Sequence, residues 1–336
     1  MSSPLLHALD TNLEHLARVV ARTRLRDPLR RKLAPHLRDA RNTVLTESLP
    51  EARRLAAGVL RHEPEAIAAY DELVAKALAK MRAYRPKGDG WLMAIDRMLY
   101  ANRPELLDDP AFPKDQRVHV LDRLDKLNDI LGSYDTFVEL TMPFVERARR
   151  NGTKKVAVHD LASGHGGFAL VLKERLGDAV EVTASDIKDE YLELGRAAAK
   201  ERGLDVRFVL QDALSLGNLA EEQIDVFTCT QTLHHFEPGM IARMIGEAAR
   251  VSRTGLVFVD AERSLMAIAA LGPFALLYGR SYAFVHDTVT SLRRMLYEEE
   301  LALLAGLAPG LPENARVETG FAFPGHAYLR IATSAE

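Results

Sequence analysis

Three acidic residues, each at the end of a short apolar segment, are the positions in this chain best suited to binding a polar ligand. Asp160 ends "KVAVHD", Asp186 ends "VEVTASD" and Asp212 ends "VRFVLQD". The first is followed by Gly164 and Gly166 and then by the amphipathic segment "FALVLKERLG". An apolar strand, a glycine turn and a helix, in that order, form the cofactor-binding loop of many α/β proteins. The sequence therefore predicts a cofactor site here.

Two cofactors fit this loop. The pattern Gly164-x-Gly166-x-x-Ala169, with Asp186 about twenty residues further on, satisfies the dinucleotide fingerprint. A pyrophosphate, however, is held by amide groups at a helix N-terminus, and the carboxylate of Asp160 would repel it. The same carboxylate suits a ligand with a positive ammonium group. An NAD-dependent oxidoreductase remains an alternative.

The stretch Asp160-Leu-Ala-Ser-Gly164-His-Gly166 resembles the first motif of the class I S-adenosylmethionine-dependent methyltransferases. Ala162 stands where that family usually has a glycine, which the motif tolerates if the backbone there keeps a negative φ. The resemblance covers roughly residues 115–334. It implies that the loop and Asp160 hold the methionine part of S-adenosylmethionine, Asp186 the ribose and Asp212 the adenine. The cofactor-binding residues it implies are Asp160, Ala162, Ser163, Gly164, Gly166, Asp186, Ile187, Asp212, Ala213 and Thr230.

The layout "DAERS…HD…SLRRMLYEEEL" is similar to a small-molecule subgroup related to the ubiquinone and menaquinone methyltransferases. This similarity implies O-methylation of a phenolic or polyketide-type hydroxyl. C-methylation of a quinol-type ring and a non-catalytic cofactor-binding relative are the alternatives. An oxygen acceptor benefits from a base, because a phenol with a pKa near 10 is largely protonated at neutral pH.

Histidines are the natural candidates for that base. His235 and His234 follow the fourth predicted strand, with His235 slightly favoured, and His286 lies in the segment after the fifth. His286 and Asp287 form a possible oriented pair, although Asp287 suits equally well the N-cap of a helix over 288–307. No metal ion is predicted. The predicted substrate-binding residues after the fifth strand are Asp260, Arg263, Tyr278 and Tyr282.

The elements that must position these residues begin near residue 155. Seven strand-like segments are predicted, and helical segments separate the first five. The alternation predicts a Rossmann-like class I methyltransferase fold with a mainly parallel seven-stranded sheet, closed by an antiparallel pair on either side of "PGH". The predicted strands are 155–160, 180–186, 206–212, 224–230, 255–262, 315–323 and 327–334.

Residues 1–114 are predicted to form an all-α region, a lid or a dimerisation arm, and residues 115–336 the catalytic domain. Helix breaks are expected at Pro28, Pro50, Pro64 and 85–90, and 102–115 reads as a loop. A single helix is expected over 117–150. The expected apolar face of that helix consists of Val118, Leu121, Leu124, Leu127 and Leu131.

Composition places the chain among ordinary globular proteins, with 336 residues, 47% apolar residues and a net charge of −3. We therefore expect a small-molecule acceptor rather than nucleic acid or a membrane as the partner, with a homodimer through the N-terminal helices as a possibility. The single cysteine, Cys229, lies in an apolar run and predicts a buried thiol without a disulfide. The N-terminus does not resemble a signal peptide, so a cytoplasmic location is expected.

Overall fold

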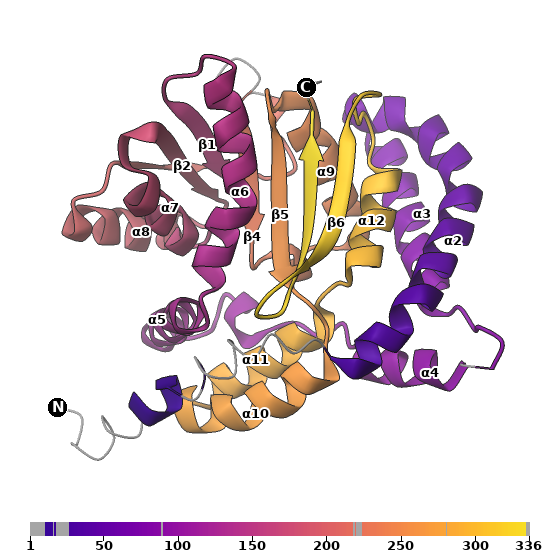
Figure 1. Cartoon of the computed structure of the whole chain (residues 1–336), viewed down its shortest axis with the longest axis horizontal. Coiled ribbons are helices and arrows are strands. Elements are labelled where there is room, and N and C mark those ends of the chain that lie inside the picture. The colour runs from indigo at the N-terminus through magenta and orange to yellow at the C-terminus, as the bar shows by residue number, and fades with distance from the viewer. Residues whose placement is uncertain are drawn as a thin grey trace.

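The sheet predicted from the sequence forms the centre of the molecule (Figure 1). The structure is a computed structural model that describes residues 11–15, 17, 27–88, 90–217, 219, 224–279 and 281–333. Seven strands lie in the order β3-β2-β1-β4-β5-β7-β6. Their bounds are β1 Val156–Asp160, β2 Val180–Asp186, β3 Val206–Leu210, β4 Val226–Thr230, β5 Gly255–Ala261, β6 Arg316–Ala322 and β7 His326–Ala332.

The sheet is mixed, and the expectation of a mainly parallel sheet is corrected in this respect. β1, β2, β3, β4 and β5 pair in parallel with their neighbours, whereas β7 is antiparallel to both β5 and β6. The antiparallel pairing of the last two strands was predicted, but the insertion of β7 between β5 and β6 was not. β6 is therefore an edge strand, and β7 separates it from β5.

Helices cover both faces of the sheet and the edge at which the parallel strands end. Their bounds are α2 Pro28–Leu60, α3 Pro64–Arg82, α4 Gly90–Leu99, η1 Leu106–Asp108, α5 Lys114–Leu131, α6 Ser133–Arg150, α7 Gly167–Leu176, η2 Gly177–Ala179, α8 Asp189–Arg202, η4 Leu233–His235, α9 Pro238–Val251, α10 Leu265–Gly279, α11 Tyr282–Arg294 and α12 Glu298–Leu307. The helix expected between β3 and β4, "LAEEQ", lies mostly outside the described residues.

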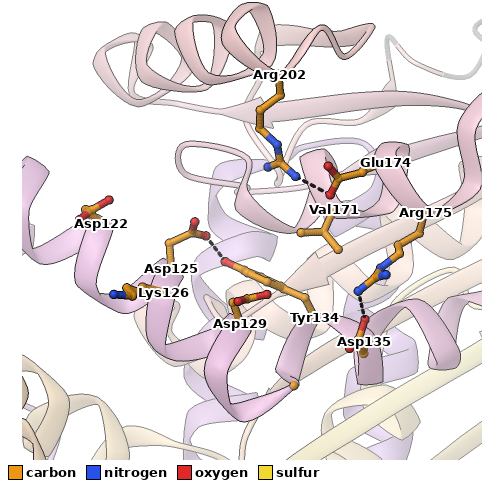
Figure 2. Close-up of a pocket in the computed structure, with 11 residues that line it drawn as sticks. Asp122, Asp125, Lys126, Asp129, Tyr134, Asp135, Val171, Glu174, Arg175 and Arg202 are labelled. Atoms are coloured by element: carbon orange, nitrogen blue, oxygen red, sulfur yellow. Dashed lines mark hydrogen bonds and ion pairs between the residues drawn. The ribbon is translucent and has the colours of Figure 1, made fainter. Parts of the chain in front are cut away.

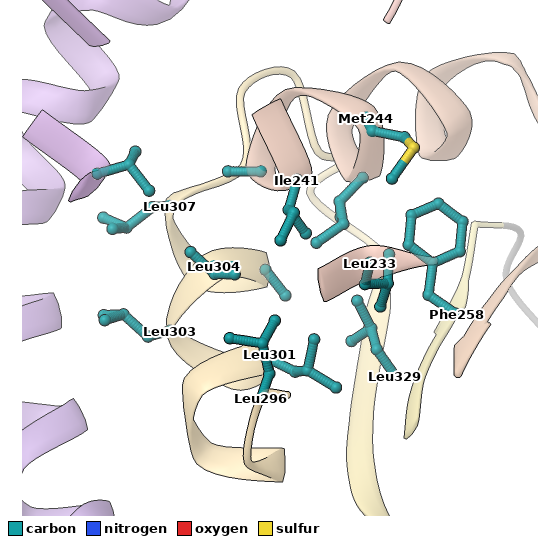
Figure 3. Packing of buried hydrophobic residues seen from close by; sticks show 14 of the residues in the cluster. Leu233, Ile241, Met244, Phe258, Leu296, Leu301, Leu303, Leu304, Leu307 and Leu329 are labelled. Atoms are coloured by element: carbon teal, nitrogen blue, oxygen red, sulfur yellow. The ribbon is translucent and has the colours of Figure 1, made fainter. Parts of the chain in front are cut away.

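Two apolar layers enclose the sheet because successive strand residues point to opposite faces. On one face α6, α7 and α8 pack against residues such as Val226 and Val257. On the other face Phe227 and Phe258 contact a cluster built from α9, α12, α2 and α3. Figure 3 shows leucines of α12 facing α9 in this cluster. The cluster also holds Cys229, whose thiol is buried and unpaired as predicted.

A third buried cluster lies at the carboxyl ends of the parallel strands. It joins η1, α5, α10 and α11, which lie together below the sheet in Figure 1. Members include Leu107, Val120, Tyr278 and Phe284. This layer covers the edge where the predicted site residues meet.

Two helix boundaries differ from the sequence-based expectation. α2 continues through Pro50, whereas Pro28 and Pro64 begin α2 and α3 as expected. The helix expected over 117–150 divides at Gly132, whose φ of +73° ends α5 and begins α6. Because of this turn, α5 lies across the carboxyl ends of the parallel strands, and α6 packs against one face of the sheet. Of the expected apolar face, Leu127 is buried but Val118 is exposed. Among the described helices, none combines the length and apolar character needed to cross a bilayer.

Candidate functional site

The loop between β1 and α7 has the backbone of a tight ligand-binding turn. Gly164 and Gly166 have φ values of +58° and +79°. A Cβ atom at Gly166 would lie 2.7 Å from Phe208, so this position requires glycine for space as well as for conformation. The amide of Ser163 donates to the carbonyl of Ser185 at 2.8 Å, which fixes the loop against β2.

Ala162 does not keep the negative φ that the motif comparison required. Its φ is +47°, in the left-handed region that costs a non-glycine residue about 1–2 kcal/mol. The family's usual glycine would avoid this cost, so the chain stores strain at the first turn of its cofactor loop. The expectation about Ala162 is therefore wrong. The loop has the left-handed backbone that glycine adopts easily, although the residue at this position is alanine.

Ala162→Gly is expected to raise the free energy of unfolding by about 0.5–1 kcal/mol, because relief of the strain exceeds the greater chain entropy of glycine. Urea titration followed by far-UV circular dichroism measures this difference. Ala197→Gly, at an exposed position of α8, is the matched control and should be destabilising by about 1 kcal/mol. A loss of stability at both positions would contradict the assignment of strain to Ala162.

The three acids at strand ends have different surroundings. Asp186 accepts hydrogen bonds from the amides of Gly164 and Lys188, both at 2.9 Å, and so links the glycine loop to the turn after β2. Asp212 is exposed and accepts from the amide of Leu214 at 2.9 Å. Asp160 is buried, and one of its oxygens accepts from the hydroxyl of Thr228 at 2.7 Å. Of the three acids only Asp212 is thus exposed, whereas Asp160 and Asp186 are buried.

The loop retains polar and apolar groups that suit a bound ligand. The Ser163 hydroxyl is buried and has no hydrogen-bond partner within the described part of the chain. The side chain of Ile187 is 67% exposed beside Asp186, whereas Ala213 is buried and Thr230 is half-buried. An unsatisfied buried hydroxyl is costly unless a ligand or water completes it. These residues therefore fit the nucleoside cofactor that the sequence resemblance implies.

Burial raises the pKa of Asp160 to about 7, although the Thr228 hydroxyl acts in the opposite direction. Pairing with a ligand ammonium group needs the ionised carboxylate. The affinity for S-adenosylhomocysteine is therefore expected to fall as pH drops below about 7, by up to about tenfold per pH unit. Calorimetric titrations between pH 6 and 8 test this.

Asp160→Asn is the control for this pH dependence, because asparagine keeps an acceptor for Thr228. The variant should bind more weakly at pH 8 and show no change in affinity from pH 6 to 8. If variant and wild type bind S-adenosylhomocysteine equally well at pH 8, the Asp160 carboxylate serves only to accept the hydrogen bond from Thr228 of β4.

Helix α5 covers the cofactor loop. His165 in the loop lies 3.5 Å from Asp125, and Gln231, which follows β4 with a φ of +58°, donates to Asn128 at 3.3 Å. Further along α5, Arg117 forms an ion pair with Glu190 of α8. The helix thus spans the ends of β1, β2 and β4, and a cofactor in this position would be shielded from water.

A polar cavity of about 340 Å³ lies on another side of α5 and does not coincide with the predicted site. Figure 2 shows its lining, in which Arg202 pairs with Glu174 at 2.7 Å and Arg175 with Asp135 at 2.9 Å. No residue predicted to bind cofactor or substrate lines it. These ion pairs and that of Lys126 with Glu14 already use the cations of the cavity, so we assign the site to the strand ends instead.

The segment around η1 crosses the ends of β4 and β5 and adds acidic side chains that the sequence did not indicate. The carboxylates are those of Glu105 and Asp108. Both carboxylate oxygens of Asp287 in α11 accept from amides of η1, at 2.8 Å from Leu106 and 3.0 Å from Leu107. Asp287 therefore anchors this segment. It lies inside α11, whose N-cap is Ser281, so it is not the helix cap considered above.

His234 is buried between two carboxylates. Its Nδ1 lies 2.7 Å from Asp260, and its Nε2 lies 3.4 Å from Glu105. Burial lowers the pKa of His234, but the two carboxylates outweigh this and raise it to about 10. Burial raises the pKa of Glu105, and the hydrogen bond and charge of His234 bring it down to about 2. His234 is therefore a cation at neutral pH and not a base.

His235 is partly exposed, and both of its ring nitrogens face carboxylates. Nδ1 lies 3.2 Å from Asp108 and Nε2 lies 3.8 Å from Glu105. His286 differs, because its Nδ1 lies 2.8 Å from Asp287 while no ion pair engages Nε2 among the described residues. Of the three predicted histidines, His286 thus has the geometry of an imidazole oriented by one carboxylate.

The residues predicted to bind the substrate are mostly internal. Asp260 is buried and holds both the amide and the ring of His234. Arg263 is fully buried in ion pairs with Asp96 and Glu300, and Tyr278 is fully buried under α11. Only Tyr282 is exposed, with its ring 5.7 Å from that of His286. The prediction that Arg263 and Tyr278 contact substrate does not fit these positions.

Comparisons with known proteins identify relatives of this arrangement. A family model described as "Methyltransferase domain" matches residues 158–255. A demethylmenaquinone methyltransferase from Thermus thermophilus is 30% identical over 220 residues, which cover 63% of this chain and 86% of that relative. A second, from Deinococcus radiodurans, is 38% identical over 79 residues, or 24% of this chain and 32% of that relative.

Solved structures share the fold. The plantazolicin methyltransferase BamL, solved with a desmethyl substrate analogue and SAH, has a TM-score of 0.53 at 14% identity. The similarity covers 72% of this chain and 99% of that one. The related BpumL with SAH has a TM-score of 0.52 at 12% identity, over 78% of this chain and 100% of that one. At such identities the likeness concerns the fold alone.

Proposed function

Because the chain belongs to the class I S-adenosylmethionine-dependent methyltransferases of the quinone-methyltransferase type, we propose that it methylates a phenolic hydroxyl of an aromatic small molecule. The enzyme class, the cofactor and a small-molecule acceptor follow from the family. The choice of a phenolic acceptor is our proposal. The observation that carries it is the group of imidazoles and carboxylates from η1, η4 and α11 beside the cofactor loop.

The cofactor would be held by residues of the first three strand ends. The glycine loop and Asp160 would take the methionine part, Asp186 the ribose and Asp212 the adenine. S-adenosylmethionine, when bound, supplies a methyl group already activated on a sulfonium sulfur. The protein therefore contributes mainly position and exclusion of water, and α5, α10 and α11 cover the edge for this purpose.

A phenolic acceptor requires loss of a proton as its oxygen becomes methylated. His286 takes this proton at Nε2, while Asp287 holds Nδ1 and keeps the ring oriented. His234 is excluded from this role because it is already protonated, and His235 because both of its nitrogens face carboxylates. This assignment differs from the slight preference for His235 that the sequence suggested.

The test is methyl transfer from deuterium-labelled S-adenosylmethionine to a panel of phenols and hydroquinones, with the corresponding methyl ethers as controls. Mass spectrometry should show one added methyl group on hydroxylated acceptors and none on the ethers. Carbon-13 NMR should then show a methoxy carbon. Methylation of amines or carboxylic acids, with none of phenols, would overturn the proposal.

The second candidate is C-methylation of a quinol-type ring, which the demethylmenaquinone methyltransferase relatives favour. Such a reaction also begins with loss of a phenolic proton, so the same base would serve. A ring-methyl carbon in the NMR spectrum of the product would select this candidate.

A further inference from the structure

We propose that Glu105, His234 and His235 form a binding site for a divalent first-row transition-metal ion. Each offers one ligand atom, and these atoms lie within 4.8 Å of one another. The sequence predicted no metal, because the carboxylate lies more than a hundred residues before the two histidines. The fold alone brings η1 over η4.

The separations of the ligand atoms suit one shared ion. Glu105 Oε1 lies 3.4 Å from His234 Nε2, and Glu105 Oε2 lies 3.8 Å from His235 Nε2. Bonds from a metal to imidazole nitrogen and carboxylate oxygen are about 2.0–2.2 Å, so two such ligand atoms can be at most about 4.3 Å apart. Both pairs that include Glu105 meet this limit, and all three ligand atoms lie within 4.8 Å of one another.

The two imidazoles are oriented as metal-binding histidines usually are. The Nδ1 of His234 lies 2.7 Å from Asp260, and the Nδ1 of His235 lies 3.2 Å from Asp108. In each ring a carboxylate therefore faces Nδ1, while Nε2 lies toward Glu105. A carboxylate behind a ligating histidine fixes its tautomer and makes the other nitrogen a better ligand.

The three ligand residues are buried on one side and reach solvent on the other. Glu105 and His234 are buried, and the Ser291 hydroxyl donates to Glu105 at 2.5 Å. The side chain of His235 is 31% exposed, which leaves coordination positions for a ligand from outside. The charge of a bound ion would be balanced by Glu105 and by the carboxylates of Asp260 and Asp108 behind the two imidazoles.

Two histidines and one carboxylate are typical ligands of Zn²⁺, Fe²⁺ and related ions. The role of the ion rests on the proposed function: its open positions would bind the oxygens of a hydroxylated aromatic acceptor and lower the pKa of the hydroxyl. No oxidation or reduction is involved. The ion would act beside His286, which receives the proton.

The experiment uses the full-length protein after chelator treatment and dialysis. Zn²⁺ is titrated by calorimetry, and Co²⁺ by its visible absorption bands. We expect one ion per chain with micromolar affinity for Zn²⁺. Asp108→Asn should weaken binding by about 10–100-fold, and His235→Ala or Glu105→Gln should weaken it by about 100-fold or more, because they remove a ligand itself.

His286→Gln is the matched control, since it removes a neighbouring histidine outside the cluster and should leave Zn²⁺ affinity unchanged. Far-UV circular dichroism confirms that each variant is folded. The proposal is overturned if the wild type binds neither ion at micromolar concentrations, or if His235→Ala and Glu105→Gln bind as tightly as the wild type. Metal binding without methyl transfer to any phenol or hydroquinone would instead refute the proposed function and leave the metal site standing.

Discussion

Arg263→Met is expected to lower the free energy of unfolding by about 3–5 kcal/mol, the usual result of removing one partner from a buried ion pair. Arg263 is fully buried and contacts Asp96 at 3.0 Å and Glu300 at 3.2 Å. Its guanidinium also lies 4.2 Å from the centre of the Tyr297 ring. Methionine fills a similar volume but leaves two buried carboxylates without their shared cation. Urea titration at pH 7 measures the loss.

The pH dependence of this effect separates charge from packing. Burial raises the pKa of Glu300, but Arg263 and Arg82 outweigh it and lower the pKa to about 2. A carboxyl with a lowered folded-state pKa stabilises the fold above its unfolded value, and this contribution is lost as pH falls from about 4.5 towards 2. In the variant Glu300 gains a proton more readily, so the difference from wild type should shrink between pH 7 and 4.

Arg330→Met is the matched control, because Arg330 pairs with Glu318 at the surface. Its effect should stay below about 1 kcal/mol. Equal losses in the two variants, or a loss for Arg263→Met that does not change with pH, would contradict an electrostatic origin.

His286→Gln is expected to lower kcat for a phenolic acceptor by about 100-fold or more, the usual contribution of a general base. The reason is that Asp287 orients the ring of His286 through Nδ1, while no ion pair within the described part of the chain engages Nε2. Steady-state kinetics with saturating cofactor measure the change. The affinity for S-adenosylhomocysteine should be unaffected, because His286 lies in α11 and not in the glycine loop.

His15→Gln, at an exposed position near the N-terminus, controls for loss of a histidine as such and should keep wild-type kinetics. An acceptor that is already ionised, such as a nitrophenolate, should lose much less activity with His286→Gln than a neutral phenol does. Full activity of His286→Gln on neutral phenols would remove this residue from the mechanism. In that case His235→Gln becomes the next variant to measure.

Much of the fold could be predicted because alternation and strand ends are local features. All seven strands lie within a few residues of their predicted bounds, and Asp160, Asp186 and Asp212 are at or just past the ends of β1, β2 and β3. The turn at Gly132 was missed because the apolar spacing of 117–131 continues into the next helix. The left-handed backbone at Ala162 was missed because alanine gives no signal for it. The domain boundary near residue 114 stays a prediction.

Two acidic residues of the candidate site could not be predicted from the sequence, because they lie far along the chain from the histidines that they contact. His234 and His235 could be found from their place after the fourth strand. Glu105 and Asp108 could not, since they lie in a segment that reads as a loop and owe their position to hydrogen bonds with α11. Arg263 was misjudged because its position after β5 suggested an exposed ligand, whereas its partner Asp96 lies in α4.

The buried ion pairs also determine when the chain can become native during synthesis. Arg30 and Arg82 leave the ribosome early, but their partners Glu299 and Glu300 follow 269 and 218 residues later. Until α12 has emerged, Arg30 lacks two of its three carboxylate partners, and the apolar cluster of α2, α3 and α9 lacks the leucines of α12. Contacts between residues so far apart in the sequence form slowly, and hydrophobic surface stays exposed until they have formed. A nascent chain that stalls before residue 298 should for this reason be a substrate for chaperones.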